Sequence, residues 1–114
     1  MRYVPDTGHV IKVDLDPIAG HEQSGWRPAI VLSPNAYNSK TSLVVAVPVT
    51  NHVKGYPFEV RLPSQMKTTG VVLADQIRSL DWQARRAKYV ETAPSSVLKD
   101  IHERLGLLLG LTRT

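Results

Sequence analysis

The stretch Leu43-Val44-Val45-Ala46-Val47-Pro48-Val49 is the strongest strand signal in the chain, since six of its seven residues are Val, Leu or Ala. A short apolar run rich in β-branched residues is typical of a strand. Pro48 has no backbone N–H to donate to a neighbouring strand, so we expect it to interrupt this one.

Weaker strand signals lie on both sides of this run. Val10–Asp16 alternates apolar and polar residues up to Pro17, which predicts a half-buried strand that ends there. Pro28–Leu32 is continuously apolar and predicts a strand buried on both faces, and Phe58–Leu62 alternates cleanly. Further short strands are expected at 70–74 and 75–80, as two strands or one bent strand, and at 88–90.

The connecting segments are polar or rich in turn residues. Residues 18–25 and 51–56 show no hydrophobic period and predict loops. Ser33–Asn38 carries capping and turn residues and predicts about one helical turn.

The hydrophobic period changes near the C-terminus, where Pro94 suits the first turn of a helix. Apolar residues then recur every three or four positions, and Gly110 stands where a helix often ends in a left-handed glycine. Several strands followed by one helix predict a mainly β fold with α, a small bent antiparallel sheet or barrel capped by a C-terminal helix. The helical stripe consists of Val97, Leu98, Ile101, Leu105, Leu108 and Leu109.

Length and composition exclude several classes of protein. The chain has 114 residues and no cysteine, which excludes disulfides, zinc ribbons, iron–sulfur clusters and a thiol nucleophile. A chain of this length indicates one domain, placed at 1–114, and is too short for a (β/α)₈ barrel. No stretch approaches the roughly 20 apolar residues that cross a bilayer, and the N-terminus does not resemble a signal peptide. We therefore expect a soluble, cytoplasmic domain that does not bind membranes.

The charge balance favours an acidic partner. Fourteen Lys and Arg residues against ten Asp and Glu residues give a formal net charge of +4. On so small a surface this surplus attracts polyanions, nucleic acid first and an acidic protein segment next.

Metal and cofactor motifs are missing from the sequence. Both His-Glu dipeptides, at His21 and His102, are followed at the fourth position by glycine, so the H-E-x-x-H zinc motif fails twice. Phosphate-binding and dinucleotide-binding glycine motifs are missing as well. The sequence predicts no metal and no cofactor.

The segment 20–28, Gly-His-Glu-Gln-Ser-Gly-Trp-Arg-Pro, is the most unusual loop. It gathers an imidazole, a carboxylate, an amide, an indole and a guanidinium between two expected strands, and loops on a rigid scaffold often carry binding sites. The planar fork of Arg27 matches a phosphate group. The alternative is a solvated loop with a weak surface ion pair between Glu22 and Arg27.

Two further polar groups emerge from apolar surroundings. Thr50 directly follows the central strand, so its hydroxyl lies at a strand end, where it can serve a site or merely cap the turn at 51–52. Gln76 and Arg78 alternate within 75–80 and are expected on one face of a strand, as a site or as a polar edge or subunit contact.

Basic and aromatic residues lie close together in two segments. Arg85 and Arg86 follow Trp82, and Lys54 precedes Tyr56. Such combinations suit single-stranded nucleic acid, whose bases stack on rings and whose phosphates pair with cations. The alternative is a solvated basic turn.

Taken in order, these segments resemble the MazF family of toxins, PemK/Kid-like mRNA interferases of type II toxin–antitoxin pairs. The likeness runs from about Arg2 to Gly110. Its pieces are Arg2–Asp6 with Gly8, Asp14–Pro17, Gly20-x-Glu22-Gln23-x-Gly25-x-Arg27-Pro28, Val31–Pro34, Pro48–Thr50, Lys54–Val60 and Leu73–Ser79.

The resemblance implies an SH3-like barrel of the CcdB/MazF type, a homodimer, and sequence-specific, metal-independent cleavage of single-stranded RNA. It also implies a cognate antitoxin whose acidic, extended C-terminal tail covers the RNA-binding surface. The functional arginine, threonine and glutamate of the family fall on Arg27, Thr50 and Glu22, which we expect to be catalytic. The expected RNA-binding residues are His21, Gln23, Trp26, Asn38, Lys54, Tyr56, Gln76, Arg78, Arg85 and Arg86.

Metal-free RNA cleavage uses the substrate's 2′-hydroxyl as nucleophile and leaves 2′,3′-cyclic phosphate and 5′-hydroxyl ends. Arg27 is suited to the negatively charged phosphorane, and Glu22 is expected to act as general base, with His21 as the alternative acid or base. Two other functions compete: a non-catalytic, gyrase-inhibiting toxin on the same scaffold, and a plain nucleic-acid-binding barrel.

Overall fold

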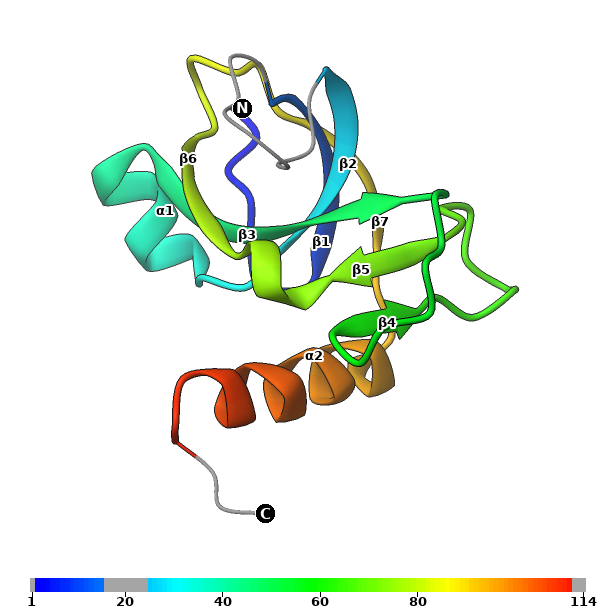
Figure 1. Ribbon diagram of the computed structural model, residues 1–114. Coiled ribbons are helices and arrows are strands. Elements are labelled where there is room, and N and C mark those ends of the chain that lie inside the picture. The colour runs from blue at the N-terminus through cyan, green and yellow to red at the C-terminus, as the bar shows by residue number, and fades with distance from the viewer. Residues whose placement is uncertain (1, 16–24, 112–114) are drawn as a thin grey trace.

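The computed structural model describes residues 2–15 and 25–111. Seven strands, two α-helices and one short 3₁₀ helix follow one another along the chain in these ranges (Figure 1). In order they are β1 (His9–Asp14), β2 (Trp26–Val31), α1 (Asn35–Thr41), β3 (Leu43–Thr50), β4 (Glu59–Arg61), β5 (Val71–Leu73), η1 (Ala74–Gln76), β6 (Arg78–Asp81), β7 (Lys88–Thr92) and α2 (Ser95–Leu108).

The central run quoted above forms β3, and the sheet is built around it. The strands pair antiparallel in the order β4-β5-β3-β2-β1-β7, while β6 pairs with the first half of β3. This confirms the predicted bent antiparallel sheet with a C-terminal helix. Among the described strands β4 and β7 each have one neighbour, so the sheet is open.

Pro48 does not interrupt β3, contrary to the expectation from the sequence. The Val45 carbonyl accepts a hydrogen bond from the Leu32 N–H on the β2 side. Because backbone groups alternate along a strand, the Pro48 nitrogen faces the opposite edge. At that edge β6 pairs with β3 no further than Ala46, and the pairing of β3 with β5 begins at Val49, so neither described strand requires the missing N–H of Pro48.

One face of the sheet packs against α2, which lies beside β4 in Figure 1. Val97, Ile101 and Leu105 are buried there in one cluster with Val10 and Ile30, as the helical stripe predicts. Leu108 and Leu109 are instead 42% and 57% exposed. The helix ends at Leu108, so Leu109 lies outside it.

The end of α2 confirms the role predicted for Gly110. Its φ is +72°, and its N–H donates to the Leu107 carbonyl, while the Leu111 N–H donates to the Gly106 carbonyl. This pair of hydrogen bonds defines a Schellman motif. In the ranges that the structure describes, no helix is long and apolar enough to cross a membrane.

The opposite face of the sheet holds a second apolar cluster, which includes Val13, Val31, Leu80 and Trp82. The Trp82 indole N–H donates to the backbone carbonyl of Asn38 at 2.9 Å, which ties the β6–β7 turn to α1. The helix α1 itself spans more than the single turn predicted for Ser33–Asn38.

The segment 70–81 forms two strands with a 3₁₀ helix between them. Gln76 therefore lies at the end of η1, and the prediction that it shares a strand face with Arg78 was wrong. The turn allows the chain to leave β5, which pairs with the end of β3, and to enter β6, which pairs with its beginning.

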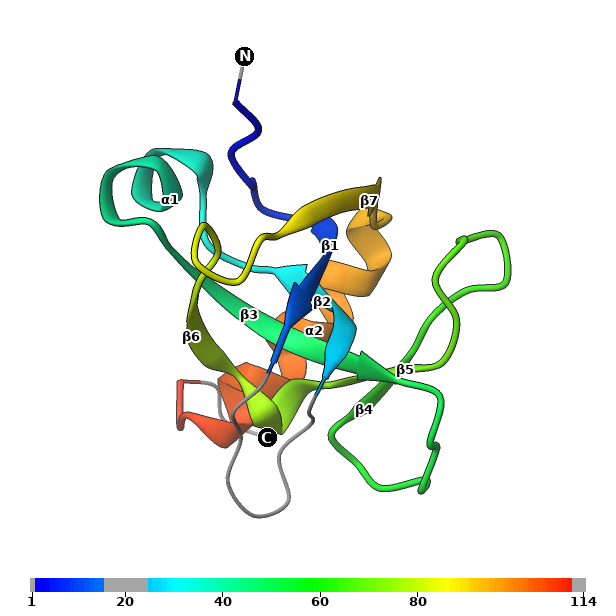
Figure 2. The same ribbon diagram turned by 90° about the horizontal axis from the view of Figure 1, so that it is seen from above.

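Gly70 permits a close contact between the 63–70 loop and the end of β3. Its φ is +107°, and a Cβ atom at this position would lie 2.2 Å from the Thr50 carbonyl oxygen and 2.9 Å from Asn51 Oδ1. In Figure 2 the 63–70 loop, which joins β4 to β5, and the 51–58 loop, which follows β3, both lie on the side of the molecule away from α1.

We expect Gly70→Ala to be much more destabilising than Gly110→Ala. Both force alanine into a left-handed conformation, at about 1–2 kcal/mol, but only Gly70→Ala adds an overlap with backbone, worth about 1–3 kcal/mol. Nothing lies within 4 Å of a Cβ at Gly110. Urea unfolding measures both changes, and equal midpoints would contradict the close contact at Gly70.

Candidate functional site

A pocket of about 350 Å³ opens at the end of β3 where Thr50 lies. It brings together five residues singled out from the sequence, which come from β2, β3, the 51–58 loop and η1. They are Arg27, Thr50, Lys54, Tyr56 and Gln76.

The register between β2 and β3 explains why Arg27 and Thr50 meet. Ala29 lies opposite Pro48, and continuing this antiparallel register by two residues brings Arg27 level with Thr50. Residues two apart on a strand share a face, and both side chains line the pocket. Residues 23 positions apart in sequence thus form one edge of the site.

Thr50 is buried, with 5% of its surface exposed. Its Oγ1 accepts a hydrogen bond from the His52 backbone N–H at 3.1 Å. The capping role considered from the sequence is therefore present, and it leaves the hydroxyl hydrogen available to donate.

The 51–58 loop is held in place by Glu59, the first residue of β4. The carboxylate of Glu59 accepts hydrogen bonds from the backbone N–H groups of Lys54 and Gly55, at 2.9 and 2.8 Å. Gly55 adopts a φ of +84°, which suits glycine. This arrangement fixes the position of Lys54 at the pocket.

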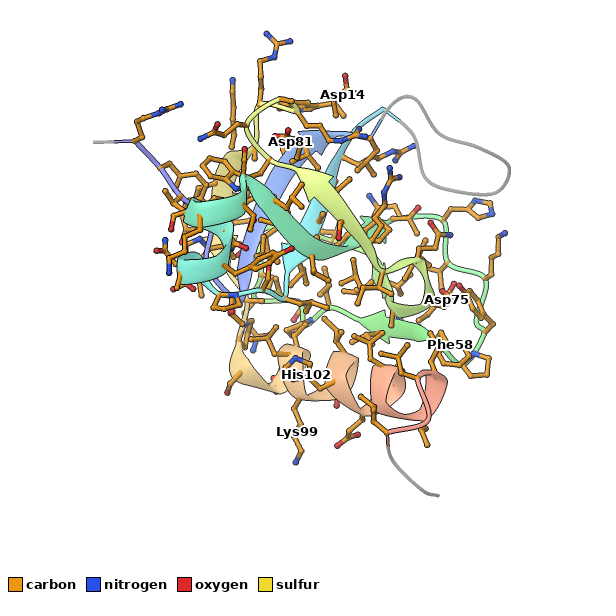
Figure 3. The ribbon with its side chains drawn as sticks, turned by 90° about the vertical axis from the view of Figure 1, so that its left-hand side faces the viewer. Asp14, Phe58, Asp75, Asp81, Lys99 and His102 are labelled. Atoms are coloured by element: carbon orange, nitrogen blue, oxygen red, sulfur yellow. The ribbon has the colours of Figure 1, made fainter. Side chains whose placement is uncertain are left out.

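Tyr56 ties the same loop to η1. Its hydroxyl donates to Asp75 Oδ1 at 2.6 Å, and Figure 3 shows Asp75 on the same side of the molecule as Phe58. Burial, followed by the hydrogen bond and the charge of Asp75, raises the pKa of Tyr56 to about 12. Tyr56 is therefore a neutral tether at physiological pH.

Sequence reasoning missed four residues that also line the pocket: Asn51, His52, Glu59 and Leu73. The first two belong to the turn noted after Thr50, and their position beside a strand end was the available signal. For Glu59 and Leu73 the only signal was their place in segments that carry the family likeness, because the alternation that marks their strands carries no information about which strand ends meet.

Several expected RNA-binding residues lie elsewhere. Trp26 is 44% exposed on β2 but does not line the pocket. Arg78 pairs with Ala46 on the other half of β3. The Arg85 guanidinium donates to the Asp14 carbonyl at 2.7 Å, and Arg86 lines a separate shallow pocket beside Trp82. None of these four residues lines the pocket that contains Arg27. His21, Glu22 and Gln23 lie outside the described residues.

Asn38 does not fit the expected RNA contact, because none of its surface is exposed. Its Nδ2 donates to the carbonyls of Pro5 and Ser33, at 2.8 and 3.0 Å, and its Oδ1 accepts from Ser33 Oγ at 2.6 Å. Asn38 therefore joins the N-terminal segment to α1, and we omit it from the candidate interface.

Residues 2–15 and 25–111 contain no group of three or more His, Asp or Glu side chains placed to hold a metal ion. The described pocket wall instead combines the cations Arg27 and Lys54 with the hydroxyl of Thr50 and the amides of Asn51 and Gln76. Such a wall suits a phosphate-containing ligand.

Residues 6–109 match the family described as "PemK-like, MazF-like toxin of type II toxin-antitoxin system". The chain belongs to this family. The resemblance stated from the sequence is thus confirmed over most of its length.

Similar relatives cover nearly the same length. The chain is 50% identical over 109 residues to endoribonuclease toxin MazF of Escherichia coli K12, covering 96% of this chain and 97% of that protein. It is 41% identical over 108 residues to endoribonuclease PemK of E. coli, covering 91% and 81%.

Solved structures agree with the fold. The crystal structure of MazF from Deinococcus radiodurans superposes with a TM-score of 0.93 at 56% identity, covering 96% of this chain and 99% of that one. A MazE–MazF complex from the same organism gives 0.85 at 50% identity, covering 96% and 98%.

We expect Asn38→Ala to reduce the free energy of unfolding by about 2–3 kcal/mol, because it leaves buried hydrogen-bonding groups of Pro5 and Ser33 unpaired. Ser39→Ala in the same helix removes only an exposed hydrogen bond to the Ala36 carbonyl and is the control; we expect a change below about 0.5 kcal/mol. Urea unfolding of both variants measures the difference. Equal stabilities would exclude a structural role for Asn38.

Proposed function

We propose that this chain is a sequence-specific, ribosome-independent and metal-independent endoribonuclease that cleaves single-stranded RNA, the toxin of a type II toxin–antitoxin pair. The observation that carries the proposal is the meeting of Arg27, Thr50 and Lys54 in one pocket. Family membership and relatives named as endoribonucleases support it. A net charge of +4 favours a polyanionic substrate.

In the proposed reaction the 2′-oxygen of the substrate attacks the adjacent phosphorus. A bond forms between the 2′-oxygen and phosphorus, the bond from phosphorus to the 5′-oxygen breaks, and the products are a 2′,3′-cyclic phosphate and a 5′-hydroxyl. Arg27 stabilises the extra negative charge of the phosphorane. Thr50 donates its hydroxyl hydrogen to a phosphoryl oxygen, since its own oxygen already accepts from His52 N–H.

The two proton transfers need a base and an acid. Glu22 is the proposed base, carried over from the family resemblance. Glu59 is unsuited because two backbone N–H groups hold its carboxylate. His21 is the acid candidate from the sequence, and His52 is the imidazole that lines the described pocket. We assign the acid that protonates the 5′-oxygen to His52.

The partners that we propose, an antitoxin and a second copy of this chain, are those that the family resemblance implies. A cognate antitoxin with an acidic, extended C-terminal tail would compete with RNA for the cationic pocket, and the similar MazE–MazF complexes support such a pairing. We further propose that the toxin acts as a homodimer in the cytoplasm.

Arg27→Ala is expected to reduce cleavage about 10²–10³-fold, the usual loss when one charge-stabilising donor is removed. Arg61→Ala, on the exposed face of β4 and outside the pocket, removes the same charge and should retain full activity. The measurement is cleavage of a long RNA in EDTA, followed by gel electrophoresis.

Two further results distinguish the alternatives. Deoxyribose at the cleaved position should block cutting, because it removes the nucleophile. Intact RNA with the unaltered protein would favour a gyrase-inhibiting toxin or a binding barrel, and cleavage that requires a divalent cation would contradict the metal-independent reaction.

The assignment of base and acid predicts the pH dependence. Glu22→Gln should lower kcat about 10²–10⁴-fold and remove the fall in rate at low pH, since the base must be deprotonated. His52→Gln should remove the fall at high pH, because the acid must be protonated. His102→Gln on α2 is the control. Loss of the high-pH fall in His21→Gln, with a normal profile in His52→Gln, would transfer the acid role to His21.

A further inference from the structure

A second pocket, of about 300 Å³, adjoins the first at the end of β3. Lys12, Lys67, Thr69 and Asn51 line it with polar groups, and Pro28 forms part of its apolar wall. Asn51 also lines the first pocket, so the two cavities share one side chain.

The two pockets lie on opposite faces of the sheet. Arg27 lines the first and Pro28 the second, and consecutive residues of a strand point to opposite faces. Lys12 pairs directly with Pro28 and so shares its face. In Figure 2 the 51–58 loop, which follows β3, and the 63–70 loop, which joins β4 to β5, extend in different directions.

The second pocket presents mainly hydrogen-bond donors. The Thr69 hydroxyl donates to Asn51 Oδ1 at 2.9 Å. Because this contact occupies the amide oxygen, Asn51 presents its NH₂ group to a ligand. Gly70 allows the turn to approach closely enough for this hydrogen bond.

The surrounding charge is positive. Lys12 and Lys67 line the pocket, and Lys88 lies directly opposite Lys12 on β7. Like charges opposite each other on neighbouring strands are unfavourable, and an anion between or beside them relieves the repulsion.

Glu91 is an acidic residue that contacts this turn. Its carboxylate accepts hydrogen bonds from the Lys67 N–H at 3.1 Å and from the N–H and hydroxyl of Thr68 at 2.7 and 2.6 Å. Burial raises the pKa of Glu91, but these hydrogen bonds and Lys67 outweigh it and lower the pKa overall. Glu91 is thus used to hold the turn, and the lysine side chains outnumber it.

We infer that the second pocket is a phosphate subsite for the same RNA strand, next to the phosphate held by Arg27. The strand passes around the end of β3 over Asn51, with one phosphate on each face of the sheet. This inference rests on the proposed endoribonuclease function, and it adds Lys12, Lys67 and Asn51 to the residues that bind the substrate.

The test uses the full chain, single lysine variants and the double variant Lys12→Ala/Lys67→Ala. The probe is an RNA oligonucleotide that contains the mapped cleavage sequence, with deoxyribose at the cleaved position so that it stays intact. Its binding is measured by fluorescence anisotropy. The slope of log binding constant against log salt concentration should become shallower by about 0.7 for each lysine removed, as for single-stranded nucleic acid. Lys99→Ala is the matched control, because Lys99 points away from the sheet on α2 (Figure 3).

On cleavable RNA the double variant should raise KM about tenfold and leave kcat unchanged, because Arg27 and Thr50 are intact. With a minimal RNA that carries only the phosphate at the cleaved bond, it should match the unaltered protein. Failure of the unaltered protein to cut RNA would overturn the proposed function, whereas cutting with an unchanged KM and salt slope in the double variant would overturn the subsite alone. Normal cleavage with lost inhibition by an acidic peptide would also overturn it and assign the pocket to a protein partner.

Discussion

The antiparallel register between β2 and β3 is the constraint on which the site depends. With Ala29 opposite Pro48, the guanidinium of Arg27 and the hydroxyl of Thr50 come to one face at one end of the sheet. A shift of a single residue would turn one of the two side chains to the other face. The register is secured by buried residues such as Ile30 and Val47, which face α2, and Val31, which faces the second cluster.

Around this fixed pair, hydrogen bonds rather than regular structure position the remaining groups. Glu59 holds the backbone at 54–55, Tyr56 joins Asp75, and Thr69 joins Asn51. In each case an acidic or amide oxygen is occupied by the protein's own donors, so the described pocket wall offers a ligand cations and side-chain amides. Such a surface favours phosphate.

The resemblance to a known family pointed to Arg27 and Thr50 as catalytic candidates, and the patterns predicted the strands and the helix that support them. The same reasoning placed Asn38 in the RNA-binding interface, although its side-chain amide donates its hydrogen bonds to the carbonyls of Pro5 and Ser33. Arg85 was also grouped with the site, and its guanidinium donates to the Asp14 carbonyl. Polarity in the sequence does not distinguish a side chain that binds a ligand from one that satisfies the backbone, because both need the same donors and acceptors.

The sequence by itself determined the fold class, the mainly β core with a C-terminal helix that ends at Gly110, and the positive charge. These properties depend on local periodicity, on glycine conformation and on composition. None of them requires knowing which strands are neighbours. Only the tertiary structure decided that β3 continues through Pro48, that η1 turns the chain between two partners of β3, and that Asn51 lies between two pockets on opposite faces. These features depend on which strands are neighbours, and hydrogen bonds between residues distant in sequence leave no periodic signal in either segment.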